Sequence, residues 1–199
     1  GKPILMYTLE RFFSADETLK LLVVLPKDHI ATWHSLCVQH QFTVCHEVIM
    51  GGKERFFSVK NGLDYINDKS GFVCIHDGVR PFISVDKISH AFEKTRELKA
   101  TTFAVDLKDS IRVIDGDDSK AVDRSLYKLI QTPQTFEVGL IQKAYEQNYS
   151  DVFTDDASVL EAIGEKVHLI DGDYENIKIT SPEDLIVGEA ILKEQIQAQ

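Results

Sequence analysis

The sequence predicts a single α/β domain over residues 1–199, built as a three-layer α/β/α sandwich around a mainly parallel sheet. Short β-branched segments alternate with longer amphipathic segments, which is typical of strand–helix–strand crossover units. Residues 72–75, Phe-Val-Cys-Ile, lack polar alternation, as expected of a parallel strand covered on both faces. A chain of 199 residues is long enough for one well-buried core and short for two.

Hydrophobic periodicity and capping residues set the expected elements. Pro3 suits the first position of a helix that has Ile4 and Phe12 on its buried face. Ser84 is expected to cap the helix after the central strand, and Thr154 is expected to cap a later one. Expected helices cover residues 3–12, 28–40, from 54, 84–98, 138–148, from 154 and from 181; expected strands cover 21–25, 42–49, 72–75, 100–107, 127–132, 167–170 and 176–179.

Two segments of the second half are marked by turn and helix signals. Thr132-Pro133-Gln134 should close the strand that begins at Tyr127. In the C-terminal helix, the spacing of apolar residues predicts an inward face. The side chains expected on that face are Leu185, Ile186, Ala190 and Ile191.

Residues 109–127 interrupt the alternation and predict a protruding β-hairpin arm. Residues 109–114 alternate polar and apolar side chains, residues 115–118 read Asp-Gly-Asp-Asp, and the chain then returns. A two-stranded hairpin is at best marginally stable alone in water. We therefore expect the arm to pack on another subunit and to make the protein a homodimer.

Charge and composition exclude several classes of protein. A net charge of −10 argues against a surface for nucleic acid or for anionic membranes, because both require a dense basic patch. No apolar run approaches the roughly 20 residues needed to cross a bilayer. The three cysteines are odd in number and lack CxxC spacing, so buried thiols in a reducing cytosol are expected rather than disulfides or a zinc site. The histidines show no ligand spacing, and the sequence supplies no set of metal-ligating residues.

The candidate site begins where the central strand ends. Residues 76–82 read His-Asp-Gly-Val-Arg-Pro-Phe, and Gly78 and Pro81 turn the chain at the carboxyl end of the strand, where open α/β sheets bind ligands. Asp77 offers a group for a metal or hydroxyl, and Arg80 offers one for a phosphate or carboxylate. An Asp–Arg pair that merely holds a turn is an equally good account of these two residues alone.

A second candidate precedes the helix at 54. Gly51 and Gly52 allow backbone N–H groups to approach a ligand, and Lys53, Arg55 and Ser58 lie near the helix N-terminus, where an anion is favoured. This segment is a candidate nucleotide cradle. A plain Gly-Gly turn with exposed charges is the commoner alternative for such a pattern.

Lys178 is the remaining unusual residue. It lies between apolar neighbours in Asn-Ile-Lys-Ile-Thr. A lysine in that position either lies on a solvated face or points into a cleft.

Six motifs occur in the order seen in one family. They are Gly-Gly-Lys-Glu-Arg-Phe-Phe-Ser-Val, His-Asp-Gly-Val-Arg-Pro-Phe, Val-Asp-Arg-Ser, Gln-Thr-Pro-Gln-Thr-Phe, Thr-Asp-Asp-Ala-Ser and Asn-Ile-Lys-Ile-Thr-Ser-Pro-Glu-Asp-Leu. The chain resembles the 2-C-methyl-D-erythritol 4-phosphate cytidylyltransferase family of the non-mevalonate isoprenoid pathway, from Lys2 to about Leu192. The resemblance implies a Rossmann-like nucleotidyltransferase fold and transfer of a cytidylyl group from CTP, with Mg²⁺ bridging the triphosphate.

The resemblance also implies roles for individual residues. Arg124 would reach into the partner subunit's site to hold the substrate phosphate, and Lys178 would orient that phosphate for attack; both are the expected catalytic residues. Ser110 stands where the family usually has threonine. The substrate-binding residues implied are Asp77, Arg80, Ser110, Thr132 and Thr154, and the nucleotide-binding residues implied are Gly51, Gly52, Lys53, Arg55, Ser58 and Gly78.

The chain departs from the family at its start. Family members begin with a glycine-rich loop whose Arg and Lys grip the triphosphate, and Gly1-Lys2-Pro3 matches the continuation after that loop. We expect the native protein to carry such a segment before Gly1. A protein lacking it would be a nucleotide-binding relative without catalysis.

Two further alternatives stay open. A sister family transfers cytidylyl to ribitol 5-phosphate with the same fold and many of the same motifs, although Val-Asp-Arg-Ser and Thr-Asp-Asp-Ala-Ser favour the methylerythritol enzyme. A nicotinamide-dependent Rossmann enzyme lacks support, because the chain has no G-x-G-x-x-G fingerprint.

Overall fold

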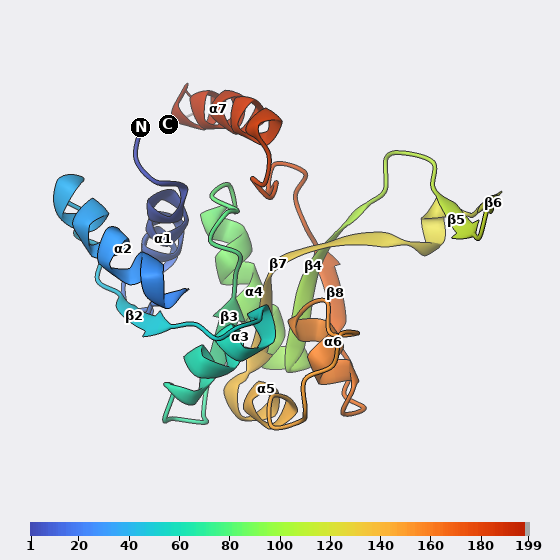
Figure 1. Ribbon diagram of the computed structural model, residues 1–199, viewed down its shortest axis with the longest axis horizontal. Helices are drawn as coiled ribbons and strands as arrows, with labels where there is room; N and C mark the ends of the chain where they lie inside the picture. Colours follow the sequence, from blue (N-terminus) through green and yellow to red (C-terminus); the bar gives the residue numbers. More distant parts are fainter. Residues whose placement is uncertain (198–199) are drawn as a thin grey trace.

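The computed structural model describes residues 1–197, and its strands carry helices on both faces (Figure 1). The three-layer α/β sandwich expected from the sequence is confirmed. Its elements are α1 (Ile4–Ala15), β1 (Leu22–Leu25), α2 (Lys27–Gln39), β2 (Glu47–Met50), α3 (Arg55–Asp64), β3 (Phe72–Ile75), α4 (Val85–Leu98), β4 (Ala100–Asp106), β5 (Arg112–Asp115), β6 (Asp118–Ala121), a 3₁₀ turn (Arg124–Leu126), β7 (Lys128–Glu137), α5 (Val138–Ala144), α6 (Asp156–Glu161), β8 (His168–Asp171) and α7 (Pro182–Gln197).

The expected predominance of parallel pairing is wrong. β3, β7, β4 and β8 form one sheet in that order, and β7 runs antiparallel to both β3 and β4; β4–β8 and the separate β1–β2 pair are parallel. The reason lies in the connection from β4 to β7, which contains the hairpin and no crossover helix. Without a crossover, the chain can only return antiparallel beside the strand it left.

β7 also continues through the proline expected to end it. The strand runs from Lys128 to Glu137 and includes Pro133. Its register with β4 shifts between Thr102, which faces Gln134, and Phe103, which faces Gln131. Proline has no backbone N–H to donate to a ladder, and the shifted register leaves it without a paired partner on β4, so the strand accommodates it.

Two expected strand segments are not regular strands. Residues 42–46 precede β2, and there Phe42 packs its ring against Trp33 while His46 accepts a hydrogen bond from the Trp33 indole at 2.9 Å. Residues 176–179 pair at one point only, where the Ile179 amide donates to the Val79 carbonyl at 2.9 Å. Individual contacts therefore take the place of regular strand pairing in both segments.

Two apolar clusters cover the two faces of the main sheet. On one face, Phe103 of β4 packs with Phe12 of α1 and Ile88 of α4. On the other face, Phe136 of β7 packs with residues of α3, α5 and α6, including Ile141. These helices therefore form the two outer layers.

The C-terminal helix differs from the sequence expectation. Leu185 and Ile186 are 48% and 73% exposed, whereas Gly188 is buried against the ring of Phe82. Because glycine has no side chain, the backbone of α7 can approach the Phe82 ring closely. The helix face centred on Gly188 therefore packs inward, and Leu185 and Ile186 point to solvent. α7 lies at one end of the molecule, near the chain start (Figure 1).

The hairpin arm is confirmed. β5 and β6 pair antiparallel, and all of their residues are exposed. The arm extends away from the body (Figure 1). Its exposed apolar side chains are Val113, Ile114, Leu126 and Tyr127.

Replacing Phe103 with alanine should lower the free energy of unfolding by about 3–5 kcal/mol, because the ring is fully buried between α1, α4 and β4. The matched control is Phe13→Ala, since Phe13 is 39% exposed. Urea unfolding of both variants measures the difference. Equal losses would contradict the assignment of Phe103 to the core.

Candidate active site

The carboxylate of Asp77 lies at the centre of the candidate site. Arg80 Nε donates to Asp77 Oδ2 at 3.2 Å, and Lys178 Nζ lies 3.2 Å from the same oxygen. The side chains of Arg80 and Asp77 are 12% and 15% exposed, whereas Lys178 is 48% exposed. Two cations from distant segments therefore meet one carboxylate oxygen at the carboxyl end of β3, and Lys178 remains open to a ligand.

This environment keeps Asp77 ionised. Burial alone would raise the pKa of Asp77, but the charge and hydrogen bond of Lys178, the charge of Arg55 and the hydrogen bond from Arg80 outweigh burial and hold the pKa below its ordinary value of 3.8. The site thus contains one permanent negative charge surrounded by cations.

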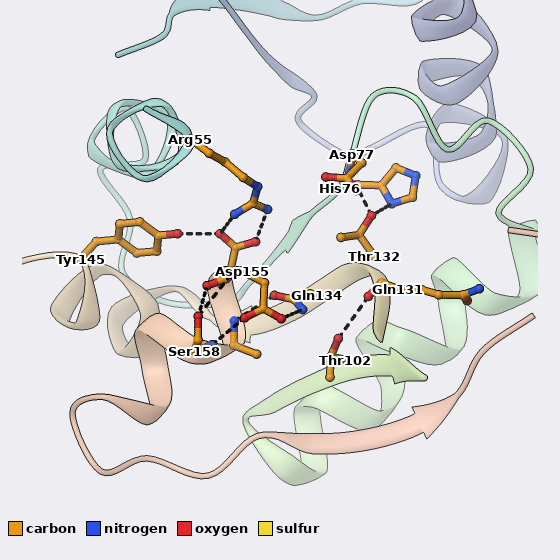
Figure 2. Close-up of polar contacts among 12 residues, drawn as sticks. Arg55, His76, Asp77, Thr102, Gln131, Thr132, Gln134, Tyr145, Asp155 and Ser158 are labelled. Atoms are coloured by element: carbon orange, nitrogen blue, oxygen red, sulfur yellow. Dashed lines mark hydrogen bonds and ion pairs between the residues drawn. The ribbon is translucent and has the colours of Figure 1, made fainter. Parts of the chain in front are cut away.

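A chain of hydrogen bonds fixes the backbone of Asp77. The Asp77 amide donates to Thr132 Oγ1 at 3.0 Å, and the Thr132 hydroxyl lies 3.0 Å from His76 Nδ1 (Figure 2). His76 Nε2 lies 3.0 Å from the Arg80 carbonyl. Because a carbonyl can only accept, Nε2 carries the ring proton and Nδ1 accepts from the Thr132 hydroxyl. Burial lowers the pKa of His76 to about 4, so the ring is neutral at pH 7.

Arg55 is held by a buried acid. Its Nη1 and Nη2 donate to the two oxygens of Asp156 at 2.9 and 2.6 Å, and the hydroxyl of Tyr145 donates to Asp156 Oδ1 at 2.6 Å (Figure 2). Asp156 is fully buried. Burial alone would lower the pKa of Arg55, but Asp156 outweighs it and raises the pKa; burial and Asp156 both raise the pKa of Tyr145. Two of the Arg55 nitrogens are therefore occupied within the protein.

The two acids at the start of α6 have separate structural partners. Asp155, not Thr154 as expected, is the N-cap: its carboxylate accepts from the Ser158 amide, and the Ser158 hydroxyl closes a capping box. Asp155 also accepts from the Gln134 amide at 2.8 Å (Figure 2). Thr154 is exposed and borders a hollow of about 260 Å³ between α6 and the sheet, apart from the cations on Asp77. The geometry does not bring Thr154 to Asp77.

The Gly-Gly turn before α3 is closely packed. A Cβ on Gly52 would lie 2.3 Å from Phe57 Cβ, so only glycine fits there. Ser58 Oγ accepts from the Gly52 amide at 3.1 Å and thereby fastens the turn to the helix. Lys53 Nζ lies over the Phe57 ring, 5.2 Å from its centre. Gly51 is also tight, because an added Cβ would lie 2.9 Å from Ser58 Oγ.

The remaining predicted residues lie in three places. Gly78 faces α1, where its carbonyl accepts from the buried Thr8 hydroxyl at 2.8 Å. Ser110 and Arg124 are exposed on the arm, and Arg124 donates to the Lys108 carbonyl of the same chain. Within the single chain the structure therefore joins Asp77, Arg80 and Lys178, fastens Thr132 to Asp77, and leaves Arg124 on the arm.

Neither metal clusters nor membrane spans occur in the described part of the chain. Across residues 1–197, no group of three or more His, Cys, Asp or Glu side chains is placed to hold a metal ion. No helix within this range is both long and apolar enough to cross a bilayer. All three cysteines are free, but Cys45 is exposed, so the expectation of buried thiols is wrong for Cys45.

Comparison with known proteins identifies the family. The family model described as IspD: 2-C-methyl-D-erythritol 4-phosphate cytidylyltransferase matches residues 1–194. The chain belongs to this cytidylyltransferase family. A curated relative of that name from Bacteroides thetaiotaomicron is 47% identical over 192 residues, covering 96% of this chain and 87% of the relative. A relative of the same name from Porphyromonas gingivalis is 43% identical over 193 residues, covering 96% of this chain and 86% of the relative.

Solved structures agree with this assignment. The crystal structure of 4-diphosphocytidyl-2C-methyl-D-erythritol synthase from Anaerococcus prevotii superposes with a TM-score of 0.85 at 31% identity, covering 97% of this chain and 87% of that one. The cytidylyltransferase from Francisella tularensis gives a TM-score of 0.79 at 29% identity, covering 96% and 88%. The Rossmann-like nucleotidyltransferase fold and membership of an enzyme family are thus established.

Sequence reasoning missed four polar residues that support the candidate site. They are His76, Tyr145, Asp156 and Asn176. His76, Asp156 and Asn176 lie inside the motifs quoted above, so their place in those motifs was an available signal. Tyr145 had none, because an aromatic residue in an amphipathic helix is most often a core residue.

Replacing Arg55 with methionine should lower the free energy of unfolding by about 3 kcal/mol, the lower end of the range for breaking a buried pair, because Arg55 is itself 42% exposed. The loss comes from leaving the Asp156 carboxylate buried without its cation. Lys94→Met is the control: it removes an exposed pair with Glu97 and should cost under about 1 kcal/mol. Chemical unfolding that ranks the two variants equally would be inconsistent with a buried pair.

The neutral state of His76 predicts a pH-dependent stability. Its pKa is lowered from 6.5 to about 4 on folding, so the unfolded chain binds a proton that the folded chain does not. The contribution of His76 to the free energy of unfolding has its full value above pH 6.5. It decreases as the pH drops toward 4, by about 2 kcal/mol between pH 7 and pH 5. His76→Gln should show a smaller decrease over that interval in urea titrations. Identical decreases for the two proteins would rule out a neutral imidazole at this position.

Proposed function

We propose that the cluster around Asp77 binds CTP and 2-C-methyl-D-erythritol 4-phosphate and joins them, giving 4-diphosphocytidyl-2-C-methyl-D-erythritol and pyrophosphate. The observation that carries the proposal is the meeting of Arg80 and Lys178 on one oxygen of Asp77, beside the end of β3. Two cations beside the strand ends suit two phosphorylated reactants. The family match and the curated relatives of that name support the choice of reaction.

The proposed reaction requires the protein to position the two reactants and to neutralise their negative charge. A phosphate oxygen of the methylerythritol phosphate forms a bond to the α-phosphorus of CTP, and the bond from that phosphorus to the β-phosphate oxygen breaks, so pyrophosphate leaves with the electron pair. Such transfers need little covalent help, because charge neutralisation and in-line placement supply most of the barrier reduction. Lys178 orients the attacking phosphate, and Arg80 holds Asp77 in place.

The proposed nucleotide side lies at the turn before α3. Gly51, Gly52 and Ser58 form a tight turn at the N-terminus of that helix, where backbone N–H groups favour an anion. Arg55 retains a 42% exposed side chain although two of its nitrogens bind Asp156. Lys53 and Gly78 flank the proposed nucleotide position.

Asp77 is the residue of this cluster that would hold Mg²⁺, through the carboxylate oxygen that neither cation binds. Both cations bind Asp77 Oδ2, and Oδ1 has no hydrogen-bond partner within residues 1–197. Magnesium is commonly held by one or two carboxylates together with substrate phosphates, so a single carboxylate is sufficient here. The ion would neutralise charge on the triphosphate when bound. The same oxygen could instead accept a hydroxyl of the polyol.

We further propose a cytoplasmic homodimer in which each arm reaches the partner's site. Arg124 lies on an exposed arm that carries Val113, Ile114 and Tyr127 in contact with solvent, and an isolated hairpin of this kind needs a packing partner. In the dimer, Arg124 and Ser110 would complete the neighbouring site, while Thr132 holds the backbone of Asp77. The free thiols suit a reducing compartment.

Incubating the full-length protein with CTP, Mg²⁺ and either polyol phosphate tests the reaction. Turnover with methylerythritol phosphate, followed by pyrophosphate release and mass spectrometry of the product, supports the proposal. Preferential turnover of ribitol 5-phosphate would support the alternative substrate. Binding of CTP without turnover of either would identify a nucleotide-binding protein.

Removing Lys178 and Arg124 in different subunits tests their roles. Lys178→Ala and Arg124→Ala should each lower kcat by about 10²–10³-fold with little change in melting temperature, because both side chains are exposed. Dimers reassembled from an equal mixture of the two variants should recover roughly a quarter of the wild-type rate, since half are mixed and each mixed dimer has one intact site. No recovery would place Arg124 in its own subunit's site.

A further inference from the structure

The segment that carries Lys178 has no regular secondary structure. β8 ends at Asp171 and α7 begins at Pro182, and residues 172–181 between them form neither helix nor strand. No backbone ladder therefore sets the position of Lys178. Its placement must come from side-chain contacts and isolated backbone hydrogen bonds.

Gln131 fixes the start of this segment. Its side-chain amide donates to the Asp173 carbonyl at 2.7 Å and accepts from the Asp173 amide at 3.2 Å, so it pairs with Asp173 as a neighbouring strand would. Gln131 belongs to β7 and is 7% exposed. A Cβ on Gly172 would lie 2.6 Å from Gln131 Oε1, so the fit requires glycine there.

Asn176 fixes the part of the segment next to the cations. It is fully buried, and its Nδ2 donates to the Thr132 carbonyl of β7 at 2.8 Å. The backbone carbonyl of Asn176 accepts from Arg80 Nη1 at 2.8 Å. One residue thus contacts both Arg80 and the strand that anchors Asp77, two positions before Lys178.

The side-chain oxygen of Asn176 shows that this contact is not ordinary core packing. Asn176 Oδ1 is buried and has no hydrogen-bond partner among residues 1–197. Leaving a buried polar atom unpaired destabilises a fold, and an apolar side chain of similar size would avoid the cost. An apolar side chain would, however, lack the N–H group that binds the Thr132 carbonyl. We therefore attribute the presence of asparagine at position 176 to this hydrogen bond, which fixes the segment against β7.

We infer that Asn176 is a positioning residue for catalysis: by donating to the Thr132 carbonyl, its side chain holds the segment that sets Lys178 on Asp77. The inference rests on the proposed function, which makes Lys178 the group that orients the attacking phosphate. Asn176 itself is buried beneath the cations and does not touch substrate. Its loss should therefore act through Lys178 and change kcat without weakening CTP binding.

The kinetic test compares two variants of the full-length protein with a matched control. Asn176→Ala and Asn176→Asp, which keeps the size but replaces the donating group by an acceptor, should lower kcat by about 100-fold with KM for CTP unchanged, because misplacement of a reacting group by about 1 Å has an effect of this size. Thr95→Ala removes a buried hydroxyl bonded to Ala91 and Thr101, away from the site, and should leave kcat at the wild-type value. Equal kinetics for all three variants would overturn the inference.

A double variant separates positioning from general destabilisation. In the Lys178→Ala background, Asn176→Ala should cause no further loss of kcat, because the group it positions is already absent. A further loss of about the same factor as in the wild-type background would show that Asn176 acts elsewhere. Lys178→Ala with Thr95→Ala is the control pair for stability.

A crystal structure of the variant decides the placement without any turnover. In Asn176→Ala, or in Asn176→Asp if the alanine variant does not fold, Lys178 Nζ should lie beyond ion-pair distance from Asp77. Retention of the pair seen at 3.2 Å in the wild type would overturn the inference. Absence of wild-type turnover would count against the proposed function alone, since this structural result is independent of it.

Discussion

The site depends on one partly buried carboxylate that two cations share. Asp77 is 15% exposed, and burial alone would favour its neutral form, so it stays ionised only because Lys178, Arg55 and Arg80 compensate its charge. Arg80 is three residues away, but Lys178 comes from near the C-terminal helix. The charge of Asp77 therefore links two irregular segments that have no β-ladder between them. The same ion pairs gather positive side chains at one point of a chain whose net charge is −10.

β7 supplies the rigid surface against which these segments are placed. Thr132 accepts from the Asp77 amide, Gln131 pairs with Asp173, and Gln134 bonds Asp155 at the start of α6. These three polar residues of β7 are buried in the sheet, where a satisfied hydrogen bond is worth more than at the surface and an unsatisfied one costs more. The antiparallel return of the chain after the arm brings them between β3 and β4. The arm that leads into β7 also carries Arg124, so the anchoring strand directly follows the proposed dimer contact.

Two cations of the predicted nucleotide segment have internal partners. Arg55 binds the buried Asp156, and Lys53 lies over Phe57. Arg55 is thereby preorganised, since Asp156 and Tyr145 restrict its rotamers before any ligand arrives. Lys178 meets one oxygen of Asp77, whereas Arg55 binds both oxygens of the fully buried Asp156, so Lys178 is held by fewer contacts and remains available to a phosphate. Arg55 therefore shapes the site, whereas Lys178 is available to bind a ligand.

The sequence by itself determined the layer architecture, the hairpin arm, the strand that ends before Asp77 and the family, because hydrophobic periodicity, turn residues and short motifs are local signals. Tertiary structure decided what those signals do not encode. The direction of β7 followed from the missing crossover, the exposed face of α7 from the close approach of Gly188 to Phe82, and the N-cap of α6 from the geometry of Asp155. The bonding partners of Asn176, His76 and Asp156 also became visible only in three dimensions, because each of these residues bonds to a residue distant in the chain.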